Sequence, residues 1–329
     1  MELVSGVLVV DGGATRSRAV LVDRAGMPRA AAVGPPASAG RGVRDLDLLA
    51  SLRTLLARVA GATGRVAVVA GFAGAGRPAG RARARRVLAA ALAGAGVEAE
   101  ELVVTTDAHL ALLAAAGPTG SPAAVLLAGT GSVAVAGDGE RWVQVGGGGR
   151  YLDDEGSGFW LGAEALRAVV RWADGRAPEA GPLARAALAA LGRTDVAALI
   201  EAAPALWRRP AEVAALAPEV LRLAALGDPV AHDIVRRGAA GLAALAAAVC
   251  RLARLPPGAG LALGGGLLRD PSPLRTMLVA ALPADLGRVA RPLTAPPAAG
   301  GAWSYLRAHG LVAAAERLAR CLEEKPLPG

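Results

Sequence analysis

The chain has 329 residues, 53% of them hydrophobic, and a formal net charge of +8. This length allows two domains of ordinary size with a large core. No apolar run is long enough to span a bilayer, because Arg251 and Arg254 interrupt the most hydrophobic helix-like stretch. The N-terminus also lacks the basic start and the cleavage site of a signal peptide. We therefore expect a cytoplasmic protein with no membrane partner.

The positive charge comes almost entirely from arginine, since Lys325 is the only lysine. The arginines alternate with alanine in stretches such as GRARARRVLAAAL, and aromatic residues make up only 3% of the chain. Because stacked bases need aromatic platforms, we expect no nucleic-acid partner. The two cysteines, Cys250 and Cys321, lie far apart in the sequence, so they support neither a metal-binding pair nor a disulfide framework.

The first part of the chain alternates between strands and helices. Residues 5–33 predict three short strands, and helical periodicity runs from about Leu46 to Ala60. GRVAVVAGFAGAG is typical of a buried strand that ends in a glycine-rich loop, and PAGRARARRVLAAALAGAG predicts a helix that ends at glycine. EELVVTTD then predicts a strand, and a helix begins at AHLALLAAAG.

The pattern restarts after GPTGSP, with three strands predicted in AAVLLAGTGSVAVAGDGERWVQVGGGG. A long helical region follows, from about Ser157 to Leu255, in which Asp228 and Pro229 form a favourable helix start. AGLALGGGLL predicts another strand, and a last helix is expected from about Ala298 to Leu322.

Strands that alternate with helices predict an α/β protein, but the strand–turn–strand opening of each half argues against one doubly wound sheet. We expect two similar halves, each a mixed sheet with helices, that face each other across a cleft.

The opening stretch VLVVDGGATRSRAVLVD allows two compatible interpretations. Asp-Gly between two apolar strands is a strong hairpin signal. The same glycines could bring backbone N–H groups close to a phosphate, with hydroxyl donors from Thr15 and Ser17. Similar glycine-rich turns follow two later strands, at 129–132 and 264–266. An ordinary turn or close packing explains any one of them, whereas three turns together favour a triphosphate site.

Two aspartates follow predicted strands. Asp11 could hold Mg²⁺ through water or simply cap a turn. Asp107 could take a proton from an attacking alcohol or cap a helix. With an ordinary pKa of about 3.9 it would be ionised and only weakly basic, so positioning would supply most of the rate.

The stretch GGGGRYLDDEGSGFWLGAEALR is the least ordinary in the chain. It places Asp153, Asp154 and Glu155 beside flexible glycine backbone. Carboxylates accept hydrogen bonds from the hydroxyls of sugars, and the alternative is a solvated acidic turn that caps the following helix.

These segments, together with GFAGAGR, TTDAHLAL and LALGGGLL, resemble the N-acetylglucosamine kinase branch of the BadF/BadG/BcrA/BcrD ATPase family, within the actin-like sugar-kinase superfamily. The resemblance implies two ribonuclease-H-like domains with ATP between them. The first would cover residues 1–116 and a C-terminal helix at about 303–322. The second would cover 117–302, with a helical insertion.

The resemblance also implies roles for individual residues. Asp107 would be the catalytic base, and Asp11 would associate with Mg²⁺. ATP would bind Gly12, Gly13, Ala14, Thr15, Arg16, Gly129, Thr130, Gly131, Ser132, Gly265 and Gly266. The sugar would bind Ser38, Asp107, Gly147, Gly148, Asp154 and Ser157. We also expect a homodimer.

Three positions depart from the family pattern, all on the sugar side. The family usually has an aromatic residue where Gly148 stands and glycine where Asp153 stands, and its sugar-binding Asn has no match better than Ser38. We expect an ATP-dependent kinase that phosphorylates an amino sugar such as N-acetylglucosamine, at O6, with glucosamine, N-acetylmuramate or glucose as other possible acceptors. The alternatives are a BadF-type ATPase activator of a dehydratase, which carries a shared iron–sulfur cluster on paired cysteines, and a non-catalytic sugar sensor.

Overall fold

The computed structural model describes residues 6–40, 42–59, 61, 65–138 and 141–325. The chain divides into two compact units. Unit 1 comprises residues 1–123, 137–142 and 293–329, and unit 2 comprises residues 124–136 and 143–292. No helix among the described residues combines the length and the apolar character needed to cross a bilayer.

Unit 1 is built on a five-stranded mixed sheet with the order β3-β2-β1-β4-β5. The three strands expected within residues 5–33 are confirmed, although residue 5 itself lies outside the described residues. The first three strands pair antiparallel, whereas β4 and β5 continue the sheet parallel to β1. The strands are β1 (Gly6–Gly12), β2 (Ser17–Asp23), β3 (Pro28–Gly34), β4 (Arg65–Phe72) and β5 (Glu98–Thr105).

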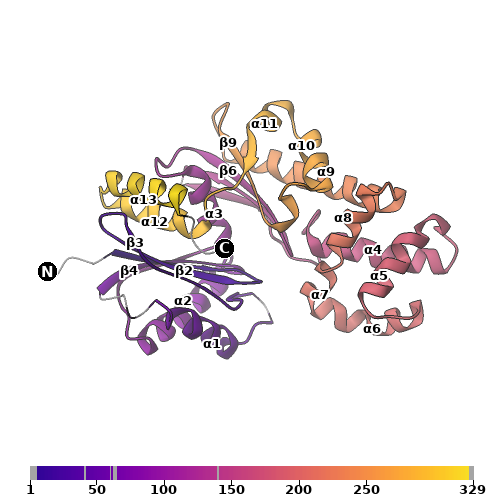
Figure 1. Ribbon diagram of the computed structural model, residues 1–329, viewed down its shortest axis with the longest axis horizontal. Helices are drawn as coiled ribbons and strands as arrows, with labels where there is room; N and C mark the ends of the chain where they lie inside the picture. Colours follow the sequence, from indigo (N-terminus) through magenta and orange to yellow (C-terminus); the bar gives the residue numbers. More distant parts are fainter. Residues whose placement is uncertain (1–5, 41, 60, 62–64, 139–140, 326–329) are drawn as a thin grey trace. The chain divides into compact units, whose positions relative to one another are not determined.

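Helices cover both faces of this sheet (Figure 1). Side chains alternate along β1, so Leu8 and Val10 pack against one helical layer and Val7 and Val9 against the other. All four are fully buried, which fixes the register of the strand. The first layer is α1 (Asp45–Leu56) and α2 (Pro78–Gly94), and the second is α3 (Asp107–Ala116), α12 (Pro297–Ala308) and α13 (Val312–Glu324).

The single last helix predicted from about Ala298 to Leu322 is wrong, because the segment forms α12 and α13. Gly310 separates them with a φ of 73°. Two main-chain hydrogen bonds close the end of α12. The N–H of Gly310 donates to the carbonyl of Arg307 at 2.9 Å, and the N–H of Leu311 donates to the carbonyl of Leu306 at 2.8 Å. Glycine just after a helix favours this left-handed ending.

The second sheet, most of which belongs to unit 2, also has five strands, in the order β10-β9-β6-β7-β8. Numbered from β6 in chain order, these strands lie in the order 5-4-1-2-3. Read from the other edge this is 3-2-1-4-5, the strand order of the first sheet. The two similar halves expected from the sequence therefore share one strand topology. The strands are β6 (Ala123–Ala128), β7 (Ser132–Gly137), β8 (Trp142–Gly146), β9 (Gly260–Gly264) and β10 (Ala290–Pro292).

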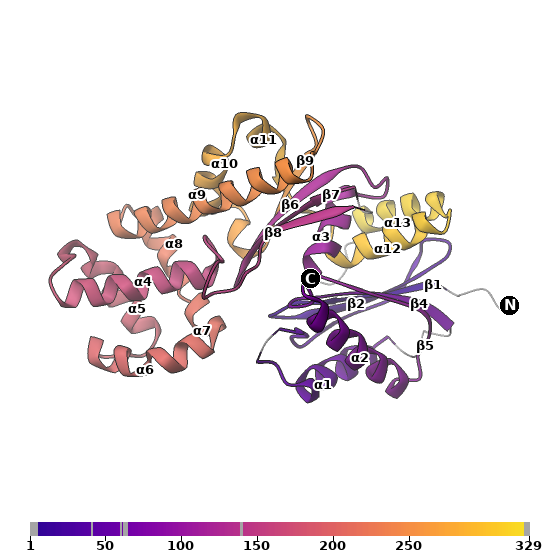
Figure 2. The same ribbon diagram turned by 180° about the vertical axis from the view of Figure 1, so that it is seen from behind.

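The long helical region forms several helices, and Figure 2 shows the longest, α9, beside strands of the second sheet. Asp228 caps α9 as predicted, since its carboxylate accepts a hydrogen bond from the N–H of Ala231 at 2.8 Å. The helices of this unit are α4 (Gly158–Ala173), α5 (Gly181–Ala190), α6 (Val196–Arg208), α7 (Pro210–Ala214), α8 (Ala217–Ala225), α9 (Pro229–Leu252), α10 (Pro273–Ala281) and α11 (Ala284–Val289).

Candidate functional site

The carboxyl ends of β1, β4 and β5 bring the two predicted aspartates to one edge of the first sheet. Asp11 pairs in register with Gly71 of β4, and Gly71 pairs with Thr105 of β5. Asp107 follows Thr105 by two residues, so it begins α3 at the same edge. In α/β proteins this edge is where ligands bind, because the parallel strands all end there.

Asp107 does not cap α3, so the capping interpretation of this residue is wrong. The cap is Thr106, whose hydroxyl oxygen accepts a hydrogen bond from the N–H of His109 at 3.0 Å. Oδ1 of Asp107 accepts one from the N–H of Ala108 at 2.9 Å. Burial raises the pKa of Asp107 to about 6, against the opposing effect of that hydrogen bond. A carboxylate with this pKa is a stronger base than the sequence predicts.

The pKa of Asp11 is also raised, to about 7, first by burial and then by the charge of Asp107. The cations Arg18 and Arg16 act in the opposite direction. Arg18 lies directly opposite Asp11 in the β1–β2 pair. Sequence reasoning missed Arg18, although counting residues across the hairpin would have placed it there. The edge therefore brings two half-buried carboxylates and a cation together.

The first glycine turn presents Ala14, Thr15 and Arg16 to solvent. The turn is closed by a hydrogen bond from the N–H of Gly13 to the carbonyl of Arg16 at 3.0 Å. Thr15 and Arg16 thus offer exposed donors to an anion. Ser17 does not, contrary to the sequence-based expectation, because it is buried and its hydroxyl donates to the carbonyl of Pro35 at 2.7 Å.

Close packing explains the glycine at position 12. A Cβ atom there would lie 2.2 Å from the ring of Phe72 and 2.5 Å from the carbonyl oxygen of Ala37. The predicted sugar ligand Ser38 follows Ala37. Its hydroxyl donates to the carbonyl of Ala73 at 3.2 Å and accepts from the N–H of Gly40 at 3.1 Å. Ser38 is therefore placed beside the first turn, with its hydroxyl proton engaged within the protein.

The second glycine turn, 129–132, repeats the design of the first. Ser132 begins β7 as Ser17 begins β2, and both are buried. The hydroxyl of Ser132 donates to the carbonyl of Glu155 at 2.9 Å. In each sheet a serine hydroxyl thus fixes the base of the turn, and the remaining residues of the second turn, 129–131, are half-buried.

The acidic segment that follows β8 supports this second turn. Oδ1 of Asp154 accepts a hydrogen bond from the N–H of Ser132 at 3.3 Å. Burial raises the pKa of Asp154, and the bond from Ser132 opposes that rise. The carbonyls of Gly129 and Thr130 accept bonds from the first N–H groups of α4, at 2.7 and 3.1 Å. Ser157 is fully buried and caps α4 by accepting from the N–H of Trp160.

Two departures from the family pattern, at positions 148 and 153, are physically linked. The N–H of Gly148 donates to Oδ2 of Asp153 at 2.8 Å. A Cβ atom at position 148 would lie 2.9 Å from both Cβ and Oδ2 of Asp153. A large side chain at position 148 and the aspartate in its present position therefore exclude each other. Gly147 joins the same cluster, since its N–H donates to the carbonyl of Ser132 at 3.0 Å.

The third glycine turn follows β9 and approaches β6. Gly265 has a φ of 95°, and a Cβ atom there would lie 2.1 Å from the carbonyl oxygen of Ala128. Gly266 and Gly129 are different, because a Cβ built at either position would have no described atom within 4 Å apart from the adjoining backbone. At these two positions neither a close contact nor a positive φ requires glycine. The space beside each is open and could accept a ligand.

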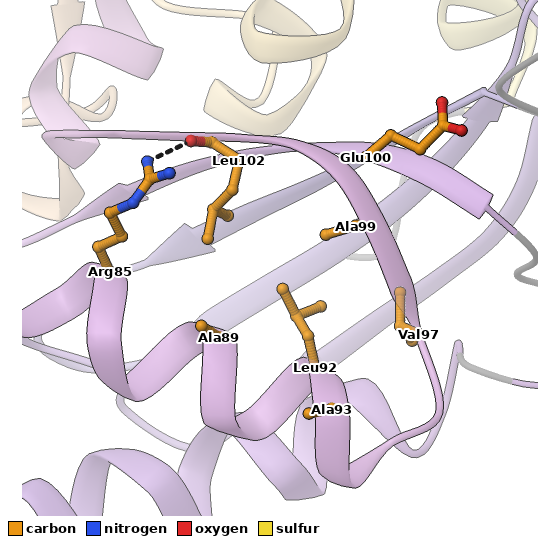
Figure 3. A pocket seen from close by; sticks show the side chains of 8 residues that line it. All are labelled: Arg85, Ala89, Leu92, Ala93, Val97, Ala99, Glu100 and Leu102. Atoms are coloured by element: carbon orange, nitrogen blue, oxygen red, sulfur yellow. Dashed lines mark hydrogen bonds between the residues drawn. The ribbon is translucent and has the colours of Figure 1, made fainter.

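A shallow hollow of about 360 Å³ between α2 and β5 lies outside this constellation (Figure 3). The guanidinium of Arg85 donates to the carbonyl of Leu102 at 2.5 Å, and Glu100 pairs with Arg65 at 2.5 Å. The charged residues that line the hollow are thus paired within the protein. None of the residues that line the hollow is a predicted site residue. They are Arg85, Ala89, Leu92, Ala93, Val97, Ala99, Glu100 and Leu102.

Among the described residues, no group of three or more His, Cys, Asp or Glu side chains forms a ready metal site. This suits Mg²⁺, which keeps several waters and binds through one or two carboxylates together with substrate phosphates. Asp11 fits that requirement. A cluster held by paired cysteines would find no pair close in sequence, because Cys250 lies on α9 and Cys321 on α13.

Comparison with known proteins gives the family and the fold. The model of the BadF/BadG/BcrA/BcrD ATPase family matches residues 8–290. No curated protein matches the chain. A solved structure from Chromobacterium violaceum, named as a candidate N-acetylglucosamine kinase, has 26% sequence identity and a TM-score of 0.66, and the match covers 92% of this chain and 99% of that one.

Two further solved structures share the fold. A candidate N-acetylglucosamine kinase from Porphyromonas gingivalis has 22% identity and a TM-score of 0.66, with 92% of this chain and 99% of that one covered. A candidate N-acetylmannosamine kinase from Listeria monocytogenes has 15% identity and a TM-score of 0.56, with 92% and 99% covered. The expected α/β fold with two mixed sheets, that of actin-like sugar kinases, is confirmed.

Proposed function

The chain belongs to the BadF/BadG/BcrA/BcrD ATPase family, and we propose that it is an ATP-dependent kinase that phosphorylates an amino sugar. The observation that carries the proposal is the pair Asp11 and Asp107 at one strand edge, where burial raises both pKa values. Strongly perturbed carboxyl groups beside an exposed anion-binding turn are typical of a catalytic centre.

In the proposed reaction, Asp107 is the catalytic base. With its pKa near 6 it is ionised at neutral pH and can accept the proton of the attacking hydroxyl. The proton moves from the sugar oxygen to the carboxylate as that oxygen bonds to the γ-phosphorus and ADP leaves. Phosphoryl transfer depends mainly on alignment and charge neutralisation, so Asp107 chiefly orients the hydroxyl and takes its proton late.

We propose ATP-binding groups in each unit separately. In unit 1, Thr15 and Arg16 offer exposed donors in the first turn, and in unit 2 the half-buried second turn leaves open space at Gly129. The open space at Gly266 suits the adenosine. Asp11 would hold Mg²⁺ through water, and the bound ion would neutralise charge on the phosphates.

The acceptor is proposed from the sugar-side groups and from the Chromobacterium violaceum structure, which is named as a candidate N-acetylglucosamine kinase. Where the family usually has an aromatic residue and a glycine, this chain has Gly148 and the carboxylate of Asp153. A carboxylate accepts hydrogen bonds from sugar hydroxyls or from an ammonium group. We therefore place N-acetylglucosamine and glucosamine first, with transfer to O6. The protein would act in the cytoplasm, as a homodimer.

A sugar panel tests the proposal. The protein is incubated with Mg²⁺ and ATP, and ADP release is measured with N-acetylglucosamine, glucosamine, N-acetylmuramate, N-acetylmannosamine, glucose or no sugar. We expect one amino sugar to stimulate ADP release at least tenfold over the sugar-free rate. If no sugar stimulates ADP release, the proposed function is wrong. The poor fit of the cysteines to an iron–sulfur cluster argues against the dehydratase activator.

A further inference from the structure

Arg83 connects three parts of unit 1 that are separate in the sequence. It lies on α2, and its side chain is 21% exposed. Its Nε donates to Asp45, the first residue of α1, at 2.5 Å. Its Nη1 donates to the carbonyls of Ala39 and Gly40, both at 3.2 Å, and its Nη2 donates to the carbonyl of Val43. One guanidinium thus satisfies three main-chain carbonyls and a carboxylate.

The carbonyls of Ala39 and Gly40 belong to the Ser38 segment, which we define as residues 37–40. Its opposite side is tied to the candidate site. The N–H of Ala37 donates to the carbonyl of Gly13 at 3.1 Å, and the N–H of Ala39 donates to the carbonyl of Ala73 at 2.8 Å. The segment is therefore held between the first glycine turn and Arg83. A movement of the guanidinium should displace the main chain on either side of Ser38.

We propose that Arg83 is a positioning residue for the acceptor, because its guanidinium holds the Ser38 segment, in which Ser38 would contact the sugar in the proposed kinase. This inference rests on the proposed function. The planar fork of arginine suits the task, since it presents donors in fixed directions to several acceptors at once. Displacing a substrate-contacting group by about 1 Å can cost a large factor in rate, so a rigid support matters.

Arg86 provides a matched control on the same helix. It donates to the other carboxylate oxygen of Asp45 at 2.7 Å, and its side chain is 68% exposed. Among the described residues, Arg86 makes no hydrogen bond with the Ser38 segment. Arg83→Met removes the carbonyl contacts but leaves Asp45 paired with Arg86, whereas Arg86→Met removes one partner of Asp45 and leaves the segment held.

The test compares Arg83→Met, Arg83→Lys and Arg86→Met with the unaltered protein. Backbone amide exchange of the Ser38 segment is measured by mass spectrometry without ligands, and KM is measured for the acceptor and for ATP. For Arg83→Met we expect faster exchange in this segment, an acceptor KM raised by about tenfold and an ATP KM within about twofold. Arg83→Lys, with one compact donor group, should recover part of the loss and serves if the Met variant does not fold. Arg86→Met should change neither quantity.

Two results overturn the proposal: unchanged exchange of the Ser38 segment in Arg83→Met, or equal changes of KM for ATP and for the acceptor. A merely structural role would alter thermal stability without this split between the two substrates. Exchange is measured without substrate, so it reports on Arg83 even if the sugar panel shows no kinase activity. Failure of the proposed function and failure of this inference are therefore distinguishable.

Discussion

Oδ1 of Asp154 accepts a hydrogen bond from the main-chain N–H of Ser132, so the acidic segment after β8 directly supports the glycine turn after β6. Asp154 has a φ of 69°, a left-handed conformation that Asp and Asn adopt more readily than other non-glycine residues. The position of Asp154 therefore supports the second glycine turn.

Replacing Asp154 tests this support of the turn. Asp154→Asn keeps an acceptor oxygen and tolerates the backbone, so the free energy of unfolding should change by less than about 0.5 kcal/mol. Asp154→Ala loses the hydrogen bond and is strained, so it should lose about 1–2 kcal/mol and raise the ATP KM. Urea unfolding and initial-rate kinetics measure both. Equal stability and equal ATP KM in the two variants would contradict this account of the turn.

The pH dependence of activity should follow Asp107. Burial raises its pKa to about 6, and only the ionised form accepts a proton. The kcat/KM for the acceptor should therefore level off above pH 7 and fall roughly tenfold per unit well below pH 6. A flat kcat/KM between pH 5 and 8 would exclude Asp107 as the base.

The pH dependence of stability should follow Asp11. Its native pKa is raised to about 7, so between about pH 4 and 7 the native state binds a proton that the unfolded chain has lost. The free energy of unfolding contributed by this group thus falls as pH rises through this range. Without Mg²⁺, Asp11→Asn should be more stable than the unaltered protein at pH 8, by about 1 kcal/mol or more, and similar at pH 4.

Urea unfolding at several pH values measures this difference. Burial disfavours the ionised form of Asp11, and a bound cation would favour it. Adding Mg²⁺ together with a nucleotide analogue should stabilise the unaltered protein more than Asp11→Asn. Equal stabilisation of both proteins by the ligands would show that Asp11 is not associated with the metal.

Two neighbouring glycines give a matched pair of variants. Gly265→Ala would place Cβ 2.1 Å from the carbonyl oxygen of Ala128 at a positive φ, so we expect a loss of stability of about 2 kcal/mol or more. Gly266→Ala meets open space, so stability should stay within about 0.5 kcal/mol while the ATP KM rises several-fold. An unchanged ATP KM in a stable Gly266→Ala protein would place the adenosine elsewhere.

Periodicity and turn chemistry were enough to predict much of the fold. Alternating apolar residues located the strands of the first sheet, and the repeated strand–turn–strand pattern predicted the duplicated topology. The break at Gly310 was missed because the residues on either side continue a helical pattern. One glycine that closes a reversal looks, in sequence, like one tolerated inside a helix.

The candidate site was predictable in part. Asp11 and Asp107 could be placed at strand ends by counting along apolar runs. The roles of Ser17, Ser132 and Arg83 could not, because each depends on a carbonyl at least 18 positions away in the chain. Such contacts depend on tertiary packing, and local patterns carry no trace of them. The link between Gly148 and Asp153 is different, since the two departures were visible but their steric cause was not.

The transferred phosphate itself tests the central claim most directly. The protein and Asp107→Asn are each incubated with Mg²⁺, ATP and the sugar that best stimulates ADP release, and the phosphorylated sugar is quantified by mass spectrometry. We predict one phosphosugar per ADP from the unaltered protein, and turnover reduced by about 10²-fold or more in Asp107→Asn with both ligands still bound. ADP formed without phosphosugar, or undiminished turnover in Asp107→Asn, would contradict the account.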